Sequence, residues 1–185
     1  MFEPNFITFV AMNILLRKAT KNDLPAVIEL IKELAAYEKA AHEVKITLEE
    51  LQKDGFGEHP LFWIILAEVD EKIVGMSFYY IRYSTWTGRN LYLEDIVVKE
   101  NFRRFGIGQL LFEETIKAAK AMKVRQMMWQ VLDWNEPALN FYKKFNAELD
   151  SEWINGKLRF EASPDPSEGG EFSPLEKPVP TSRKG

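Results

Sequence analysis

The chain has 185 residues, of which 46% are hydrophobic, and this content suits one ordinary core rather than two large domains. A formal net charge of -4 and a pI near 5.4 argue against a nucleic-acid-binding protein, because neutralising phosphates requires a concentrated basic face. The sequence has no cysteine, which excludes disulfides, thiolate metal sites and a cysteine nucleophile, and its two histidines are too few for a histidine-rich metal site. We therefore expect a cytoplasmic protein without a metal.

The two ends of the chain differ in composition from its middle. Residues 1–11 are apolar but contain Glu3 and Pro4, and they have neither the basic start of a signal peptide nor the length of a membrane span. Residues 161–185 contain five prolines and few apolar side chains that would favour ordering. We predict an N-terminal extension at 1–11, one folded domain at 12–160, and a flexible tail at 161–185, with no contact to a membrane.

Periodicity predicts the secondary structure of the first half of the domain. Apolar residues at helical spacing predict a helix over 24–37, and Thr47 with Glu50 forms a capping box that opens a short helix ending at Gly55. Runs rich in β-branched and aromatic residues predict strands, two of which form a hairpin that turns at Asp70 and Glu71. The expected strands lie at 13–18, 62–69, 73–82 and 90–98.

The second half of the domain continues with a crossover. A glycine-containing turn leads into a helix over about 108–122, a short strand follows at 127–131, and Asn135 caps a helix that Asn146 ends in the left-handed conformation. Two terminal strands are expected around 147–153 and 158–160. This order predicts an α/β fold of the α+β type, with a mixed, mostly antiparallel twisted sheet of six to seven strands and helices on both faces.

The segment 103–109 places positive charge, bare backbone and a helix start together. Gly106 and Gly108 let the backbone approach a ligand, and the start of a helix offers unpaired N–H groups with partial positive charge. Phosphate suits such a place, although the spacing matches neither a P-loop nor the full dinucleotide fingerprint. From these residues alone, a phosphate site and an ordinary strand-to-helix turn with solvated arginines both remain open.

Three polar residues near this segment are candidates for chemistry. Glu94 and Asp95 are adjacent on the strand 90–98, so we expect them on opposite faces of the sheet, with only one in a given site. We favour Glu94, because a carboxylate at the end of a buried strand must be paired, protonated or functional; a solvated edge carboxylate is the alternative. Tyr142 is either a core aromatic residue or a phenol that serves as a general acid.

Longer runs of sequence carry a family resemblance. The runs LYLEDIVV, RRFGIGQLLF and DWNEPALNFYKKF resemble the GNAT superfamily of acetyl-CoA-dependent N-acetyltransferases, whose pyrophosphate loop has Gln or Arg three places before Gly, with Gly or Ala two places further on. The runs LAAYEKAAHEVKIT, DGFGEHPLF and YYIRYSTWTGRNLYLED are similar to its spermidine/spermine acetyltransferase branch, which includes thialysine acetyltransferases. The resemblance covers nearly all of residues 12–160, and it implies the GNAT fold, acetyl-CoA as co-substrate and a homodimer.

The resemblance also implies roles for individual positions. Tyr142 matches the acid that protonates the departing thiolate, and Glu94 matches the carboxylate that accepts a proton from the attacking ammonium through water. The backbone of Ile96, Val97 and Val98 matches the strand that holds the pantetheine arm. The other positions that match coenzyme A contacts are Arg103, Arg104, Phe105, Gly106, Ile107, Gly108, Gln109 and Asn135. The positions expected to bind the amine are Tyr37, Glu38 and Trp86, with Asp95 and Glu152 as further acidic candidates.

The predicted reaction is direct acetyl transfer to a primary amine of a small cationic substrate. In the run YSTWTGR, Ser84 stands where polyamine-acetylating relatives tend to have aspartate, and this favours a thialysine, lysine-like or diamine substrate over spermine. A polyamine acetyltransferase, a non-catalytic acetyl-CoA-binding protein and a scaffold that acts through the proline-rich end are the alternatives. The chain departs from the family pattern at Arg104 and Asn146, where relatives often have glycine.

Overall fold

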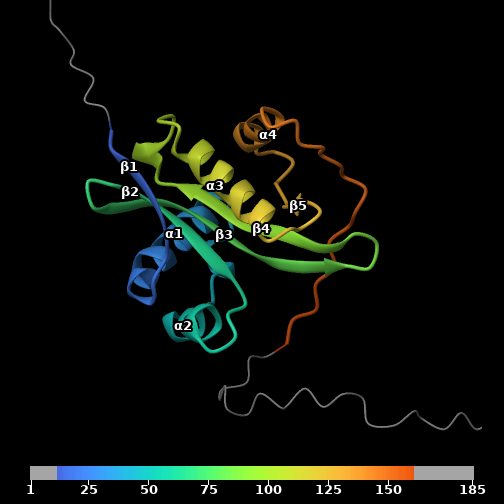
Figure 1. Ribbon diagram of the computed structural model, residues 1–185, viewed down its shortest axis with the longest axis horizontal. Coiled ribbons are helices and arrows are strands. Elements are labelled where there is room, and N and C mark those ends of the chain that lie inside the picture. The colour runs from blue at the N-terminus through green and yellow to red at the C-terminus, as the bar shows by residue number, and fades with distance from the viewer. Residues whose placement is uncertain (1–11, 161–185) are drawn as a thin grey trace, which may run out of the picture. The chain divides into compact units, whose positions relative to one another are not determined.

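The computed structural model of the protein describes residues 12–160 (Figure 1). The chain divides into two compact units, one that runs to Asn135 and one that starts at Glu136. The predicted extension at 1–11 and the predicted tail at 161–185 lie outside the described residues. The first unit contains a sheet and its helices, and the described part of the second unit, residues 136–160, contains one helix.

A five-stranded sheet forms the centre of the first unit, and its strands follow one another in sequence order. Strands β1 to β4 are antiparallel, whereas β4 and β5 are parallel, because a helix crosses over between them. The strands are β1 Ile14–Lys18, β2 Trp63–Val69, β3 Lys72–Ser84, β4 Gly88–Val98 and β5 Met127–Met128. The mixed, mostly antiparallel sheet expected from the sequence is therefore confirmed.

The hairpin between β2 and β3 turns where the sequence predicted. Asp70 and Glu71 both have positive φ angles, 48° and 60°. Two left-handed residues in succession form the type of turn whose twist matches that of the flanking antiparallel strands. This tight turn sets the register of β2 and β3. Strand β3 also pairs with β4 on its other side.

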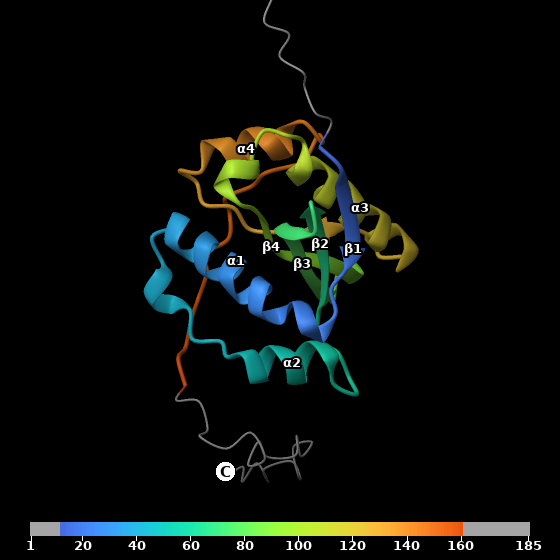
Figure 2. The ribbon, with the colours of Figure 1, turned by 90° about the vertical axis from the view of Figure 1, so that its left-hand side faces the viewer.

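Helices cover both faces of this sheet (Figure 2). Helices α1 and α2 pack on one face, where α1 contributes Leu24, Val27 and Leu30 to a fully buried core with strand residues of β2, β3 and β4. Helix α3 packs on the other face, where the hydroxyls of Ser77 and Thr115 form a buried hydrogen bond of 2.5 Å. The helices of the first unit are α1 Leu24–Tyr37, α2 Leu48–Phe56 and α3 Ile107–Ala121, with short 3-10 turns η1 Lys21–Asp23, η2 Ala41–Glu43 and η3 Glu100–Phe102.

The predicted capping box at the start of α2 is present. The Glu50 N–H donates to Thr47 Oγ1 at 3.1 Å, and the Thr47 N–H donates to Glu50 Oε2 at 2.8 Å. The helix ends at Phe56 rather than at Gly55, because the Gly57 N–H still donates to the Lys53 carbonyl at 3.1 Å. Gly57 is therefore the residue that closes this helix.

Arg17 connects β1, β2 and the start of α1. Its guanidinium donates to both carboxylate oxygens of Asp23, at 2.7 Å and 2.8 Å, and its Nε donates to Glu68 Oε1 at 2.9 Å. The hydrogen bonds from Arg17 hold the pKa of the Asp23 carboxyl well below its usual range. This ion-pair network ties the start of α1 to the sheet, and the candidate site residues Tyr37 and Glu38 lie at the other end of the helix, Tyr37 as its last residue and Glu38 directly after it.

The second unit contains helix α4, which spans Glu136–Lys143. Phe141 packs edge to face against Tyr142 and Phe145, with ring centroids 5.2 Å and 5.3 Å apart. Asn146 has a φ of 55°, so the left-handed residue predicted after this helix is confirmed. Asparagine adopts this conformation more readily than most residues, which explains how it replaces the glycine of the family pattern.

The strands predicted at the end of the domain are wrong. Residues 147–153 and 158–160 form no strand, and β5 spans two residues instead of 127–131, so the described chain has five strands rather than six to seven. A strand exists only where a neighbour accepts its backbone hydrogen bonds, and an apolar run does not reveal whether such a neighbour is present. Trp153 and Ile154, with 74% and 98% of their surface exposed, lie in the segment that lacks this pairing.

Candidate active site

Strand β4 contains a β-bulge at Glu94. The pairing with β3 joins Tyr79 to Leu93 and Phe78 to Asp95, so that Glu94 has no partner of its own. An extra residue in one strand shifts the alternation of its side chains by one position. Glu94 and Asp95 therefore lie on the same face of the sheet, the face covered by α1, and the prediction that they point to opposite faces is wrong.

The two carboxylates form an acidic group with Glu38, which directly follows α1. Burial, followed by the charges of Glu94 and Glu38, raises the pKa of Asp95 to about 7, and burial also raises the pKa of Glu38. Glu94 is exposed, and its charge, after burial, helps to raise the pKa of Tyr80. None of the three carboxylates forms an ion pair within residues 12–160, so this acidic group can attract a cationic ligand.

The loop after η3 leads into the N-terminus of α3. Gly106 precedes the helix with a φ of 81°, no side chain caps the helix, and its first turn contains no acidic residue. The Leu110 N–H donates to the Gly106 carbonyl at 3.0 Å, so the N–H groups of residues 107–109 have no acceptor within the helix. A helix start with uncapped N–H groups and no competing carboxylate is suited to an anion such as a diphosphate.

The edge of β4 is open beside this loop. The parallel pairing with β5 joins only Leu91 to Met127 and Tyr92 to Met128. Residues 93–98 of β4 therefore have no partner strand on that side within the described chain, and an extended ligand can pair with their backbone. The carbonyl of Val98, one of the predicted pantetheine contacts, already accepts a hydrogen bond of 3.0 Å from Arg103 Nε.

The two arginines of the loop differ in their surroundings. The Arg103 guanidinium lies over the Tyr37 ring, 5.1 Å from its centroid, so the side chain expected at the pyrophosphate contacts the protein instead. Arg104 has a φ of 68°, a conformation that is uncommon for residues other than glycine. This backbone geometry gives a physical reason why relatives often have glycine at that position.

Not all the predicted site residues come together in the first unit. The acidic group, the loop 103–109, Tyr37 and Asn135 lie there, whereas Tyr142 and Glu152 belong to the second unit. Trp86 is 82% exposed in the turn between β3 and β4, and six strand residues, roughly 20 Å, separate this turn from the partner of Asp95. The structure does not bring Trp86 next to the acidic group within one chain.

Two residues near the site were not predicted from the sequence. Tyr80 lies near enough to Glu94 for that carboxylate to help raise the pKa of its hydroxyl, and Trp134 packs against Tyr37 with 6.1 Å between the ring centroids. No sequence signal marked Tyr80, because its place on the face of Glu94 follows from the pairing of Tyr80 with Tyr92 across the two strands. Trp134 directly precedes Asn135, and this position beside a predicted coenzyme A contact, together with its aromatic side chain, was the only indication in the sequence that Trp134 lies near the site.

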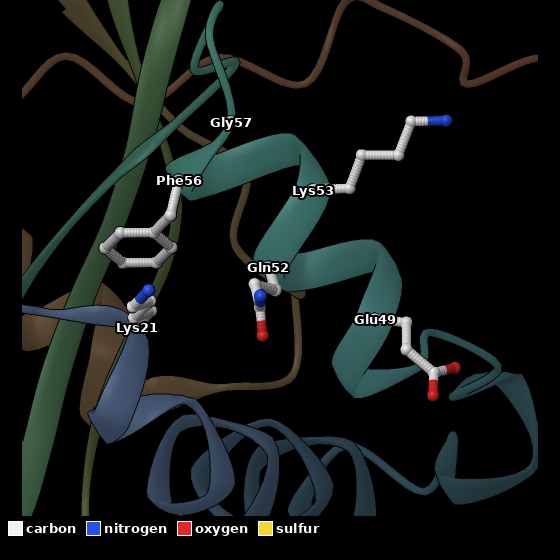
Figure 3. Close-up of a pocket in the computed structure, with 6 residues that line it drawn as sticks. All are labelled: Lys21, Glu49, Gln52, Lys53, Phe56 and Gly57. Carbon is white, nitrogen blue, oxygen red and sulfur yellow. The ribbon is translucent and has the colours of Figure 1, made fainter.

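One concave region of the described chain lies away from the predicted site residues. A surface hollow between η1 and α2 contains none of the predicted site residues (Figure 3). Its lining consists of Lys21, Glu49, Gln52, Lys53, Phe56 and Gly57. Within residues 12–160, no group of three or more metal-ligating side chains is arranged to hold a metal ion, and no helix has the length and apolar character to cross a membrane.

Comparison with known proteins identifies clear relatives. Residues 24–147 match the Acetyltransferase (GNAT) family. The chain is 40% identical over 158 residues to the Thialysine N-epsilon-acetyltransferase of Mus musculus, with 80% of this chain and 93% of the relative covered. It is 36% identical over 145 residues to the Spermidine/spermine N(1)-acetyltransferase-like protein 1 of Homo sapiens, where the match covers 74% of this chain but only 21% of that longer protein.

A solved structure has the same fold. An aminoglycoside N-acetyltransferase in complex with CoA superposes with a TM-score of 0.67, over 83% of this chain and 100% of that one. The two sequences are 17% identical, so this likeness concerns the fold alone.

The two glycines of the loop are expected to respond differently to alanine. A Cβ at Gly106 would meet no atom within 4 Å, but the φ of 81° would strain it, so Gly106→Ala should lower the free energy of unfolding by about 1–2 kcal/mol. A Cβ at Gly108 would make an ordinary contact of 3.8 Å with Val98, so Gly108→Ala should be neutral or stabilise by up to about 1 kcal/mol. Chemical denaturation measures both, and equal losses would contradict the role of the left-handed backbone.

Proposed function

Since the chain belongs to the acetyltransferase (GNAT) family and is an N-acetyltransferase, we propose that it transfers the acetyl group of acetyl-CoA directly to a primary amine of a small cationic substrate. The GNAT fold expected from the sequence is confirmed by the sheet and by its structural relatives. The observation that carries the choice of an amine is the unpaired acidic group of Glu38, Glu94 and Asp95. Thialysine, lysine and short diamines share the ammonium that such a group attracts.

The residues present fit acetyl-CoA as the co-substrate. The uncapped N–H groups of residues 107–109 would hold the diphosphate, and the open edge of β4 at Ile96 and Val97 would hold the extended pantetheine arm. Arg104 adds a positive charge at the same loop. When bound, acetyl-CoA supplies the acetyl group as a thioester.

The acidic group provides the proton route that an amine requires. An alkylammonium has a pKa near 10, so it must lose a proton before its nitrogen can attack. Asp95, with a pKa raised to about 7 by burial and by the charges of Glu94 and Glu38, accepts a proton more readily than an ordinary carboxylate does near neutral pH. Glu94, which the resemblance assigns as the acceptor, is exposed beside it and adds attraction for the cation.

Tyr142 remains the proposed general acid. It is buried in α4, and its hydroxyl would donate the proton that the departing sulfur requires. A neutral phenol suits this task because it carries no charge before the transfer. The chain has no cysteine that could hold an acetyl group, which supports direct transfer through a ternary complex.

A polyamine acetyltransferase is the second candidate, and the human relative named for spermidine and spermine favours it. Against it, Ser84 accepts hydrogen bonds from the N–H groups of Trp86 and Thr87 at 3.2 Å and 3.3 Å, and so serves to close the turn. No carboxylate occupies that turn to bind a distant ammonium of a long polycation. A homodimer, testable by light scattering, and a cytoplasmic location stay predictions.

An acceptor screen tests the proposed function. With acetyl-CoA as donor, thialysine or lysine should be acetylated with a kcat/KM at least about tenfold above that of spermine, because the turn at Ser84 has no carboxylate to bind a second ammonium. The screen should include putrescine and spermidine, with release of free thiol and product mass as readouts. A preference for spermine would establish the second candidate. Thermal stabilisation by acetyl-CoA without turnover on any amine would indicate a non-catalytic binder.

Asp95→Asn should separate activity from stability. The folded-state pKa of about 7 lies above the unfolded value of about 3.9, so the native state binds this proton more tightly and loses stability as pH rises through 7. The variant should therefore melt at a higher temperature than the wild type at pH 8, while its kcat/KM falls by about 10².

The matched control for this variant is Asp70→Asn, at an exposed turn position whose positive φ asparagine also adopts. It should change neither property. Full activity in Asp95→Asn would remove Asp95 from the proton route, and a lower melting temperature at pH 8 would contradict the raised pKa of Asp95.

Tyr142→Phe should lower kcat by about 10² or more while leaving the dissociation constant of acetyl-CoA nearly unchanged, because only the hydroxyl proton is lost. Steady-state kinetics and calorimetric titration with acetyl-CoA measure the two quantities. Near-normal turnover would assign Tyr142 to the hydrophobic packing of α4 instead.

A further inference from the structure

Tyr37, the last residue of α1, contacts two segments that the resemblance assigns to coenzyme A. The Arg103 guanidinium lies 5.1 Å from the centroid of its ring, and its hydroxyl donates to Asn135 Oδ1 at 3.2 Å. The three residues are far apart in sequence, in α1, in the loop before α3 and after β5. One aromatic side chain therefore connects all three places.

Arg103 is anchored on both sides of this contact. Its Nε donates to the Val98 carbonyl at 3.0 Å, and its backbone N–H donates to the Glu100 carbonyl at 3.1 Å. The planar guanidinium can form a directed hydrogen bond and stack on a ring at the same time, which an ammonium cannot do equally well. The side chain thus ties the end of β4 to the end of α1.

Asn135 is oriented by the same contact. It is buried, its backbone N–H donates to the Leu132 carbonyl at 2.9 Å, and its amide oxygen accepts from Tyr37. Because oxygen and nitrogen occupy opposite corners of the planar amide, fixing the oxygen also fixes the direction in which the nitrogen donates.

Aromatic packing steadies Tyr37 itself. The Trp134 ring lies 6.1 Å from its ring, and the ammonium of Lys39 lies 5.6 Å from the centroid of Trp134. The position of the phenol hydroxyl therefore depends on ring packing as well as on its hydrogen bond to Asn135. Removing a contact within this group of side chains should also change the orientation of the Asn135 amide.

We propose that Tyr37 and Arg103 are positioning residues, through which the end of α1 sets the orientation of Asn135 and of the loop that begins at Arg103. The inference rests on the proposed function in one respect, since it assumes that this loop and Asn135 serve acetyl-CoA. Glu38 follows Tyr37 directly and belongs to the acidic group, so the same end of α1 supports both sides of the site. This positioning role differs from the roles that the resemblance implies, in which Arg103 contacts the pyrophosphate and Tyr37 lines the amine pocket.

The positioning roles and the ligand-contact roles predict different effects of the conservative substitutions Arg103→Lys and Tyr37→Phe on the affinity for acetyl-CoA. If Arg103 binds diphosphate as a charge, Arg103→Lys keeps most of the affinity, because lysine also binds phosphate. If Arg103 acts through its directed hydrogen bond and its stack on Tyr37, lysine does not replace it. If Tyr37 only lines the amine pocket, Tyr37→Phe has no effect on acetyl-CoA.

The test is a double-mutant cycle on the dissociation constant of acetyl-CoA, measured by calorimetry without an amine. Tyr37→Phe and Arg103→Lys should each weaken binding by about fivefold, the order expected for one lost hydrogen bond. The cycle itself pairs Arg103→Lys with Tyr37→Leu, which removes the ring that Arg103 contacts, and this double variant should lose clearly less than the product of its two single losses. In steady-state assays, KM for acetyl-CoA should rise by a similar factor, while KM for the amine stays within about twofold.

Tyr83→Phe is the matched control, since Tyr83 is exposed on the face of β3 opposite to Tyr80 and should leave binding unchanged. Wild-type affinity in Tyr37→Phe, retained affinity in Arg103→Lys, or fully multiplicative losses would overturn the inference. If the wild type binds acetyl-CoA but acetylates no amine, the proposed function fails while the cycle still decides the inference. If the wild type does not bind acetyl-CoA, both fail.

Discussion

A strand edge that loses its neighbour must satisfy its backbone groups in another way, and β4 meets this condition beyond Tyr92. The same strand also contains the bulge at Glu94. This bulge brings two carboxylates, Glu94 and Asp95, to the face covered by α1. The open edge accounts for the proposed pantetheine contact, and the bulge accounts for the proposed amine contact. Both features lie on one strand, which sets their separation without help from flexible loops.

The site keeps several features that cost stability. Arg104 and Gly106 both have positive φ, α3 starts without a side-chain cap, and Asp95 is half-buried beside two other carboxylates. A single substitution could remove each of these features. The loop and the uncapped start of α3 suit a bound anion, and the carboxylates around Asp95 suit a bound cation. Such strain persists where the surrounding structure holds it, and here the buried core that α1 forms with Val97 of β4 supplies that support.

The two sides of the proposed site depend on the same helix. Helix α1 brings Tyr37 to Arg103 and Asn135, and the next residue, Glu38, to the acidic pair. An acetyltransferase needs donor and acceptor in fixed relative positions, because proximity supplies much of the rate enhancement. A single rigid helix end that contacts both sides is a simple way to achieve this, and it gives α1 a role beyond core packing.

The sequence by itself determined the helices α1 to α3, the β2–β3 hairpin, the α2 capping box and the family, because these depend on local periodicity and on long contiguous motifs. It did not reveal the bulge that places Glu94 and Asp95 together, since a bulge depends on pairing with a distant strand. For the same reason it overestimated the strands after Asn146 and missed the contacts of Arg103 and Tyr37. Only the tertiary structure decided these points, because hydrogen-bond partners and ring contacts between residues far apart in the chain leave no local signature.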